Sequence, residues 1–300
     1  MEISVVIPTF NEEMLLPNLL EDLRRQTFSD YEVIIADAGS ADRTREIARE
    51  YGASVVSGGL PAVGRNSGAR ASQGNFLFFL DADVRLPESF LENTHAEMEE
   101  RYLDLATCEI SPLSKHAVDG LLHDFANLAV KLGQFTDPHA PGFCILISRR
   151  LFKRIGGFDE TLKMAEDHDL VRRASQFRPL RVLNSTQVNV SVRRLEKEGR
   201  MKLINKYLAV ELHRAFLGEI KEEIFTYEFG SFTDAEQTLA DTKLQEGQEL
   251  IKRISKEYLS LWFKPGESLA TIPAERLDSL KEQFERLKEL VGSILAIHRP

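Results

Sequence analysis

The chain has 300 residues, 43% of them hydrophobic, which is enough for one large domain or for a domain with an extension. Its net charge of -9 argues against nucleic acid as a partner, and its 2 cysteines, Cys108 and Cys144, are too few and too far apart for a disulfide framework or a zinc site. No apolar run is long enough to cross a bilayer, and the chain begins with a strand-like segment rather than a signal peptide, so we expect a cytoplasmic protein.

The first segment predicts a strand followed by a helix. Residues 3–7 are mostly β-branched, as in a buried parallel strand. Leucines then recur at helical spacing over residues 15–23. We expect Asn11 to cap this helix, with Glu12 and Glu13 in its first turn.

The same unit repeats. A short strand over 33–36 ends at Asp37 and leads through a polar turn into a helix, and a third strand over 53–56 precedes a segment of small residues over 62–72. A fourth strand follows over 76–80. Strands that alternate with helices in this way predict a doubly wound, mainly parallel α/β sheet, with its ligand at the carboxyl ends of the strands.

The fourth strand ends at Asp81 and Asp83. Two carboxylates one residue apart, directly after an apolar strand, repel each other unless a cation or a hydrogen-bond donor compensates them. A hard divalent ion such as Mg²⁺ or Mn²⁺ suits these oxygen ligands and keeps positions open for phosphate. The alternative is that the pair starts a surface loop and caps the next helix.

The middle of the chain contains two further predicted strands, over 105–110 and 142–148. Between them, apolar residues fall at helical spacing over 118–132. This amphipathic helix either packs on the sheet or contacts a membrane surface or a lipid acceptor. Residues 135–142, with two prolines, predict a structured or mobile lid.

Several motifs together resemble the inverting family-two glycosyltransferases, which have a GT-A fold. They are P-T-F-N-E at 8–12, A-D-A-G-S-A-D at 36–42, V-G-R-N-S-G-A-R at 63–70, L-D-A-D at 80–83, G-G-F-D at 156–159 and E-D-H-D-L-V-R-R at 166–173. The resemblance covers roughly residues 1–200, and the order of the motifs is more specific than any one of them. One departure is Ala38, where the family often has a second aspartate.

On the donor side, the resemblance implies that Pro8, Thr9 and Glu12 border the nucleobase and ribose and that Asp37 hydrogen-bonds the base. Arg65 is implied to lie near the base or the diphosphate. From the residues alone, Asp37 is equally well explained as a turn or helix-capping residue and Arg65 as a member of a surface ion pair.

On the reaction side, the resemblance implies that Asp81 contacts the ribose or a water on the metal, and that Asp83 holds the metal that bridges the phosphates. Asp167 is implied to be the general base, and Glu166 is the second candidate for that role, with positioning of the acceptor or the base as its expected part. The alternative for Glu166 and Asp167 is an acidic first turn that only stabilises the helix dipole.

A basic cluster over 191–202 contains Arg193 and Arg194, which resemble arginines that close over the diphosphate in some relatives. A solvated basic surface, or one that faces anionic lipid, explains the cluster equally well. Farther on, apolar residues at helical spacing on both sides of a Pro-Gly break at 265–266 predict a helical hairpin that serves packing or homo-oligomer assembly.

The predicted organisation is a catalytic domain over 1–225, with a nucleotide-sugar-binding half over 1–85 and an acceptor-side half over 86–225, and a helical extension over 226–300. The predicted activity is metal-dependent transfer of a sugar from a nucleoside diphosphate to a glycan or polyprenyl-lipid acceptor, with peripheral contact to the inner face of the membrane as an additional hypothesis. The alternatives are a retaining transferase, a nucleotidyltransferase, or a catalytically silent nucleotide-sugar-binding or scaffold protein.

Overall fold

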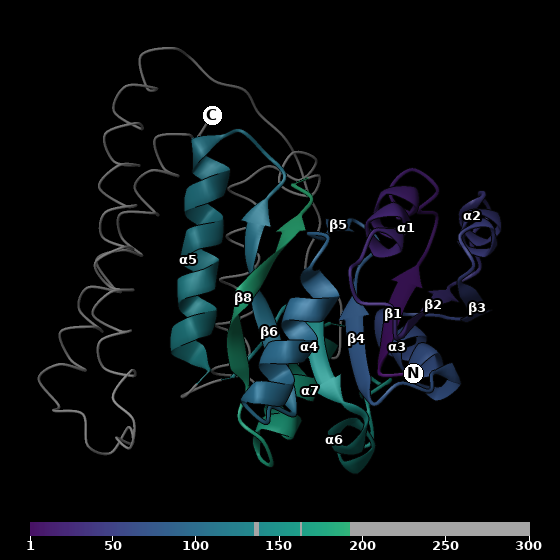
Figure 1. The fold of residues 1–300 in the computed structure, drawn as a ribbon. Helices are drawn as coiled ribbons and strands as arrows, with labels where there is room; N and C mark the ends of the chain where they lie inside the picture. Colours follow the sequence, from purple (N-terminus) through teal and green to yellow (C-terminus); the bar gives the residue numbers. More distant parts are fainter. Residues whose placement is uncertain (135–137, 163, 193–300) are drawn as a thin grey trace, which may run out of the picture. The chain divides into compact units, whose positions relative to one another are not determined.

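The computed structural model describes residues 1–134, 138–162 and 164–192 (Figure 1). Met1–Leu113 and Ala129–Ser191 belong to one compact unit, which holds the sheet and the candidate site, and Ser114–Leu128 belong to a second unit. The predicted C-terminal hairpin and the basic cluster at Arg193 and Arg194 lie outside the described residues. The predicted domain boundary near residue 225 lies there too.

Within the described residues, the strands form one sheet in the order β3-β2-β1-β4-β7-β6-β8-β5 (Figure 1). The neighbours among β1 to β4 are parallel, as predicted. The other half is mixed, because β7 runs antiparallel to both β4 and β6 while β6 and β8 are parallel. The strands are β1 (Ile3–Thr9), β2 (Tyr31–Asp37), β3 (Ser54–Ser57), β4 (Phe76–Leu80), β5 (Val84–Arg85), β6 (Leu105–Pro112), β7 (Cys144–Ser148) and β8 (Arg181–Val190).

The helices after β2, between β6 and β7 and at Glu166 lie where the sequence predicts them, whereas it predicts no helix over the small residues of α3 (Pro61–Ala71) or directly after β7. The first helix begins at Leu16 rather than just after Asn11, so the expected cap at Asn11 and the acidic first turn are wrong. The described helices are α1 (Leu16–Arg24), α2 (Thr44–Glu50), α3 (Pro61–Ala71), α4 (Phe90–Glu100), α5 (Ala117–Gly133), α6 (Arg149–Arg154) and α7 (Glu166–Ser175).

The strand β4 is buried on both faces of the sheet. Phe76, Phe78 and Leu80 pack in a cluster with side chains of α1, α2 and α4, while Leu77 and Phe79 pack in a cluster with side chains of α3, α6 and α7. Successive side chains of a strand point to opposite faces, so a strand covered by helices on both sides is apolar at every position.

The helix α3 lies unusually close to β1. A methyl group added at Gly68 would meet the Val6 side chain at 2.3 Å, so only glycine allows this approach. Arg65 precedes Gly68 by about one helical turn and therefore lies on the same face of α3. The close packing of Gly68 thus brings the face of α3 that carries Arg65 against the sheet.

Candidate active site

The polar residues predicted to converge lie at the carboxyl ends of three neighbouring parallel strands. Thr9, the last residue of β1, is paired in register with Asp37, the last residue of β2. Asp81 directly follows Leu80, the last residue of β4, which is the other neighbour of β1. The parallel half of the sheet therefore presents these side chains at one edge, as the sequence predicts.

The carboxylate of Asp37 is a hydrogen-bond acceptor within its own turn. Its Oδ1 accepts the backbone N–H groups of Gly39 at 3.1 Å and Ser40 at 2.9 Å. Its Oδ2 accepts the hydroxyl groups of Ser40 at 2.5 Å and Thr9 at 3.2 Å. With 5% of the residue exposed, Asp37 has the turn role that the sequence left as an alternative. Its contact with a nucleobase stays a prediction.

Hydrogen bonds also join the loop after β1 to the loop after β2. Asn11 has a left-handed backbone, with φ of 54°, and its N–H donates to the Ser40 hydroxyl at 2.9 Å. The Asn11 side-chain oxygen accepts the Ala41 N–H at 2.9 Å, and the N–H of Glu12 donates to the Thr44 hydroxyl at 2.8 Å. Glu12 is partly buried here and Pro8 lies in β1. The two loops are therefore held together by hydrogen bonds from backbone N–H groups of one loop to side chains of the other.

Arg65 is the centre of a buried ion network. Its Nη1 donates to Glu166 Oε1 at 2.7 Å, and its Nη2 donates to Asp81 Oδ1 at 2.9 Å and to the Gly142 carbonyl at 3.2 Å. The guanidinium lies 5.6 Å from the centre of the Phe158 ring. Arg65 is only 4% exposed, so the alternative of a surface ion pair is wrong.

The charge of Arg65 is stabilised by its neighbours. Burial alone would lower the pKa of the guanidinium, but the charges of Asp81, Glu166 and Asp167 outweigh burial and raise it. Arg65 therefore stays ionised and links the end of β4 to the start of α7.

Asp167 is held at the start of α7 by two backbone hydrogen bonds. Its Oδ2 accepts the N–H of Gly142 at 2.8 Å, and its Oδ1 accepts the N–H of His168 at 2.8 Å. The preceding Ala165 has a left-handed backbone, with φ of 57°, a conformation that costs a residue with a side chain about 1 kcal/mol. The helix start is thus both strained and tightly bonded.

Burial shapes the acidity of both carboxyl groups at this helix start. Burial raises the pKa of Asp167, although the charge of Arg65 and the two backbone donors oppose the shift. Burial also raises the pKa of Glu166, and the charge of Asp167 adds to this effect while Arg65 opposes it. Carboxyl groups with raised pKa values are better proton acceptors than ordinary ones.

Gly142 is a site residue that the sequence did not reveal. Both of its backbone polar groups bind site residues, and an added methyl group would lie 2.8 Å from Arg65 Nη2 and 3.0 Å from Asp167 Oδ2. Reasoning from side-chain chemistry cannot find a residue that acts through its backbone. The available signal was the Pro141-Gly142 pair directly before a buried strand.

The residues that fit a divalent ion are Asp81 and Asp83. Both are partly exposed acids in the turn after β4, separated by the buried Ala82, so their oxygen donors suit Mg²⁺ or Mn²⁺. Among the described residues, no third His, Cys, Asp or Glu joins these two in a compact group of possible ligands. An ion held by Asp81 and Asp83 would take its other ligands from phosphate and water.

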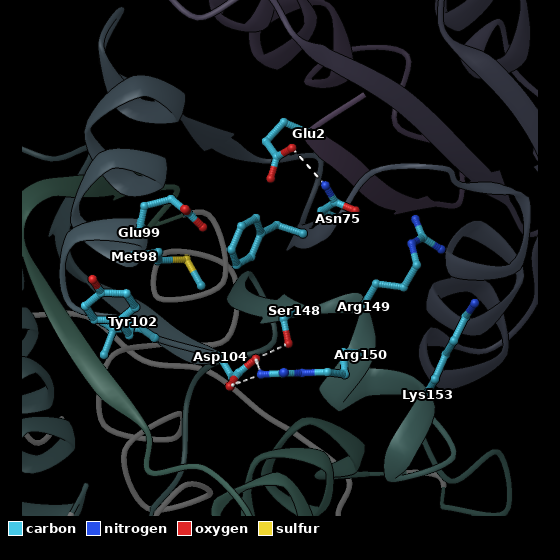
Figure 2. A pocket seen from close by; sticks show the side chains of 12 residues that line it. Glu2, Asn75, Met98, Glu99, Tyr102, Asp104, Ser148, Arg149, Arg150 and Lys153 are labelled. Carbon is cyan, nitrogen blue, oxygen red and sulfur yellow. Dashed lines mark hydrogen bonds and ion pairs between the residues drawn. The ribbon is translucent and has the colours of Figure 1, made fainter.

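A cavity of about 670 Å³ lies apart from this site, and Figure 2 shows the residues that line it. Its lining includes Glu2 and Asn75, which precede β1 and β4, so it lies at the amino ends of these strands. We place the candidate active site by its charged residues and not by this cavity.

No helix in the described part of the chain is long and apolar enough to span a membrane.

A family model described as "Glycosyl transferase family 2" matches residues 4–156. The uncharacterized glycosyltransferase EpsJ of Bacillus subtilis (strain 168) is 28% identical in an alignment of 184 residues that covers 55% of this chain and 53% of that protein. An uncharacterized glycosyltransferase of Haemophilus influenzae is 29% identical in an alignment of 195 residues that covers 58% of this chain and 62% of that protein. The matches thus span little more than half of these relatives.

Two solved structures share the fold at low sequence identity. Residues 1–349 of Staphylococcus aureus TarS in complex with UDP-GlcNAc match with a TM-score of 0.52 and 17% identity, over 99% of this chain and 84% of that one. The mannosyltransferase PcManGT from Pyrobaculum calidifontis, in complex with GDP-Man and Mn²⁺, matches with a TM-score of 0.58 and 16% identity, over 99% of this chain and 86% of that one.

Proposed function

This chain belongs to glycosyl transferase family 2, and we propose that it transfers a sugar from a nucleoside diphosphate to an acceptor hydroxyl or lipid phosphate, with inversion at the anomeric carbon. The observation that carries the proposal is the position of Arg65. Its contacts join Asp81 of the predicted donor side to Glu166 of the predicted acceptor side, although Arg65 and Glu166 are 101 positions apart in sequence. These contacts hold the predicted donor-side and acceptor-side carboxylates close together, as a reaction between two bound substrates requires.

The donor would bind across the carboxyl ends of β1, β2 and β4. Pro8, Thr9, Glu12 and Asp37 would border the nucleoside. They lie at the ends of β1 and β2 and in the loop after β1, and hydrogen bonds join these segments. Asp83, with Asp81, would hold Mg²⁺ or Mn²⁺, which neutralises the charge that develops on the diphosphate as it leaves. The solved relative with GDP-Man and Mn²⁺ supports this choice of ion.

The acceptor would be deprotonated by Asp167. As the acceptor oxygen attacks the anomeric carbon, its proton passes to the Asp167 carboxylate, and the bond to the diphosphate breaks on the opposite face. The hydrogen bond from the Gly142 N–H fixes Asp167 Oδ2, and the raised pKa makes the carboxylate a stronger proton acceptor. Glu166, held by Arg65, orients this part of the site.

A thermal-shift comparison tests the donor site. The full chain is heated with UDP, GDP or CDP, or with their sugar conjugates, in the presence and absence of Mn²⁺. A ligand that binds only the folded state adds about 2.7 kcal/mol of stability at a hundredfold excess over its dissociation constant. We expect one nucleotide to raise the melting temperature in the presence of Mn²⁺.

Two variants make this comparison specific. Asp83→Ala should lose the Mn²⁺-dependent shift, whereas Glu88→Ala, which removes an exposed acid a few residues farther along, should keep it. If no nucleotide shifts the melting temperature of the native chain, or if Asp83→Ala behaves like Glu88→Ala, the proposed donor site is wrong.

A further inference from the structure

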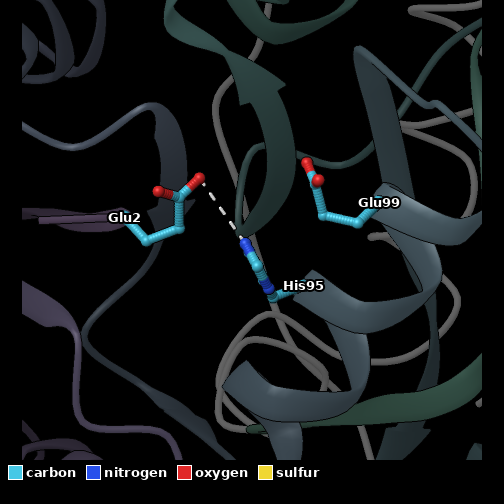
Figure 3. A group of neighbouring side chains, drawn as sticks. All are labelled: Glu2, His95 and Glu99. Carbon is cyan, nitrogen blue, oxygen red and sulfur yellow. Dashed lines mark ion pairs between the residues drawn. The ribbon is translucent and has the colours of Figure 1, made fainter.

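At the amino ends of β1 and β4, away from the candidate active site, three side chains with metal-ligand chemistry come together (Figure 3). Glu2, His95 and Glu99 each offer one ligand atom, and these atoms all lie within 4.8 Å of one another. His95 and Glu99 are one turn apart on α4 and share a face.

The backbone of Glu2 is fixed at the entry to the sheet. Its carbonyl accepts the N–H of Phe76 at 2.9 Å, and its N–H donates to the Asp30 carbonyl at 3.0 Å. Its carboxylate is oriented as well, because Glu2 Oε2 accepts a hydrogen bond from Asn75 Nδ2 at 2.9 Å. Carboxylates that bind metals are commonly held by an outer hydrogen bond of this kind.

The imidazole of His95 contacts two aromatic rings. Its centre lies 5.1 Å from that of Phe28 and 5.8 Å from that of Phe76. Its Nε2 is buried and, among the described residues, makes no hydrogen bond. Leaving a buried polar atom without a hydrogen bond costs free energy, so an ion bound at this nitrogen would stabilise the structure.

The separation between His95 and Glu2 fits a shared ion better than a hydrogen bond. His95 Nε2 lies 3.5 Å from Glu2 Oε1, beyond the usual N–H···O range of about 2.7 to 3.2 Å. Two ligands that are each about 2.1 Å from a tetrahedral ion lie about 3.4 Å apart. Glu99 is exposed, so its side chain can move toward the ion without disturbing the core.

We propose that Glu2, His95 and Glu99 form a binding site for one divalent transition-metal ion of the Zn²⁺ class. An imidazole together with two carboxylates favours such an ion over Mg²⁺ or Ca²⁺, which prefer ligand sets made of oxygen alone. Three protein ligands would leave one position for water, and two of them, Glu2 and Glu99, also line the cavity. This site is independent of the proposed transferase reaction.

Zinc titration of the metal-free full chain tests the site. Excess Mg²⁺ is kept present so that it fills the oxygen site at Asp81 and Asp83. We expect Glu99→Gln to weaken Zn²⁺ binding by at least about tenfold, the lower end of what the loss of a supporting group around a metal costs. Glu100→Gln, the same change at the next, exposed position of α4, should leave the affinity unchanged.

Two further measurements identify the ligands. X-ray absorption at the zinc edge should show one imidazole nitrogen in the native chain and none in His95→Ala. Asp83→Ala should keep zinc binding even though it removes the proposed donor metal, so the two proposals fail separately. The site is refuted if Glu99→Gln binds Zn²⁺ as tightly as the native chain, or if the bound zinc has no nitrogen ligand. If His95→Ala does not fold, the comparison of Glu99→Gln with Glu100→Gln decides alone.

Discussion

The guanidinium of Arg65 lies 2.7 Å from the carboxylate of Glu166, and both residues are buried. Removing one member of such a pair leaves the other charge without compensation. We expect Arg65→Gln to lower the free energy of unfolding by about 3 to 5 kcal/mol. Urea unfolding measures this change.

The matched control for Arg65 is on the same helix. Arg70 is exposed and pairs with Glu160 at 3.4 Å, so Arg70→Gln should cost less than about 1 kcal/mol. Equal losses of unfolding free energy in the two variants would show that the ion network of Arg65 stabilises the fold no more than an exposed ion pair does.

Gly142→Ala should damage the site specifically. The added methyl group would lie 2.8 Å from Arg65 Nη2 and 3.0 Å from Asp167 Oδ2, so these side chains must shift. We expect turnover to fall by up to about 100-fold, which is the cost of misplacing a reacting group by about 1 Å. Gly120→Ala, where an added methyl group meets no atom of the described residues within 4 Å, should leave turnover unchanged. Equal turnover in the two variants would contradict the role given to Gly142.

The pH dependence of turnover should show the raised pKa of Asp167. Because burial raises this pKa, the carboxylate takes up a proton at a higher pH than the ordinary value of about 4. Only the ionised form accepts a proton from the acceptor, so turnover should fall as pH decreases through the raised pKa. A rate profile that stays flat down to pH of about 4 would contradict the assignment.

The pH dependence of stability that Asp167 causes runs opposite to that of turnover, because the folded chain becomes less stable as pH rises. The folded chain binds the proton of Asp167 more tightly than the unfolded chain. Its stabilising contribution is therefore complete below the unfolded pKa and is lost as pH rises through the folded one. Asp167→Asn lacks this titrating group, so only the native chain loses the contribution as pH increases over this window. The difference in the free energy of unfolding between the two chains should therefore shift in favour of the variant, and urea unfolding at several pH values measures this shift.

Asp104 should stabilise the fold at neutral pH and lose this effect in acid, the reverse of the pH dependence expected for Asp167. Burial opposes its ionisation, but hydrogen bonds from Ser148, Arg178 and Arg150 outweigh burial and lower its pKa. Its contribution is therefore present above the unfolded pKa of about 4 and is lost as pH falls toward the folded value. Asp104→Asn should cost about 2 kcal/mol at neutral pH and progressively less in acid, as measured by urea unfolding. A cost that does not depend on pH would contradict this account.

The strand β4 shows what the sequence could predict. Its five apolar residues predicted the strand bounds, and all five are buried, because a strand between two helical layers has no polar position. The strand β8 was missed. A break in its register between Cys108 and Glu109 of the partner strand β6, together with exposed residues in its middle, removes the alternation that marks a strand. The strand β5, only 2 residues long, is too short to show a pattern.

The sequence predicts which side chains form the candidate site, but not the hydrogen bonds and ion pairs that join them. Residues such as Asp81 and Asp167 stand out because charged groups follow strands or begin helices. The burial of Arg65 and the hydrogen bonds of Gly142 depend on distant segments, so local sequence holds no signal for them. Asn11 illustrates the same limit, since its side chain bonds to a neighbouring loop rather than capping the helix that follows it.

The most direct test of the account is the release of nucleoside diphosphate by Asp167→Asn. The donor is the nucleotide sugar identified by thermal shift, supplied with Mn²⁺ and with either an acceptor or water alone. Because the base contributes to the transition state and not to donor binding, the variant should bind the donor as the native chain does and release product about 10² to 10⁴ times more slowly. Unchanged release by Asp167→Asn would show that another group is the base and that the central assignment is wrong.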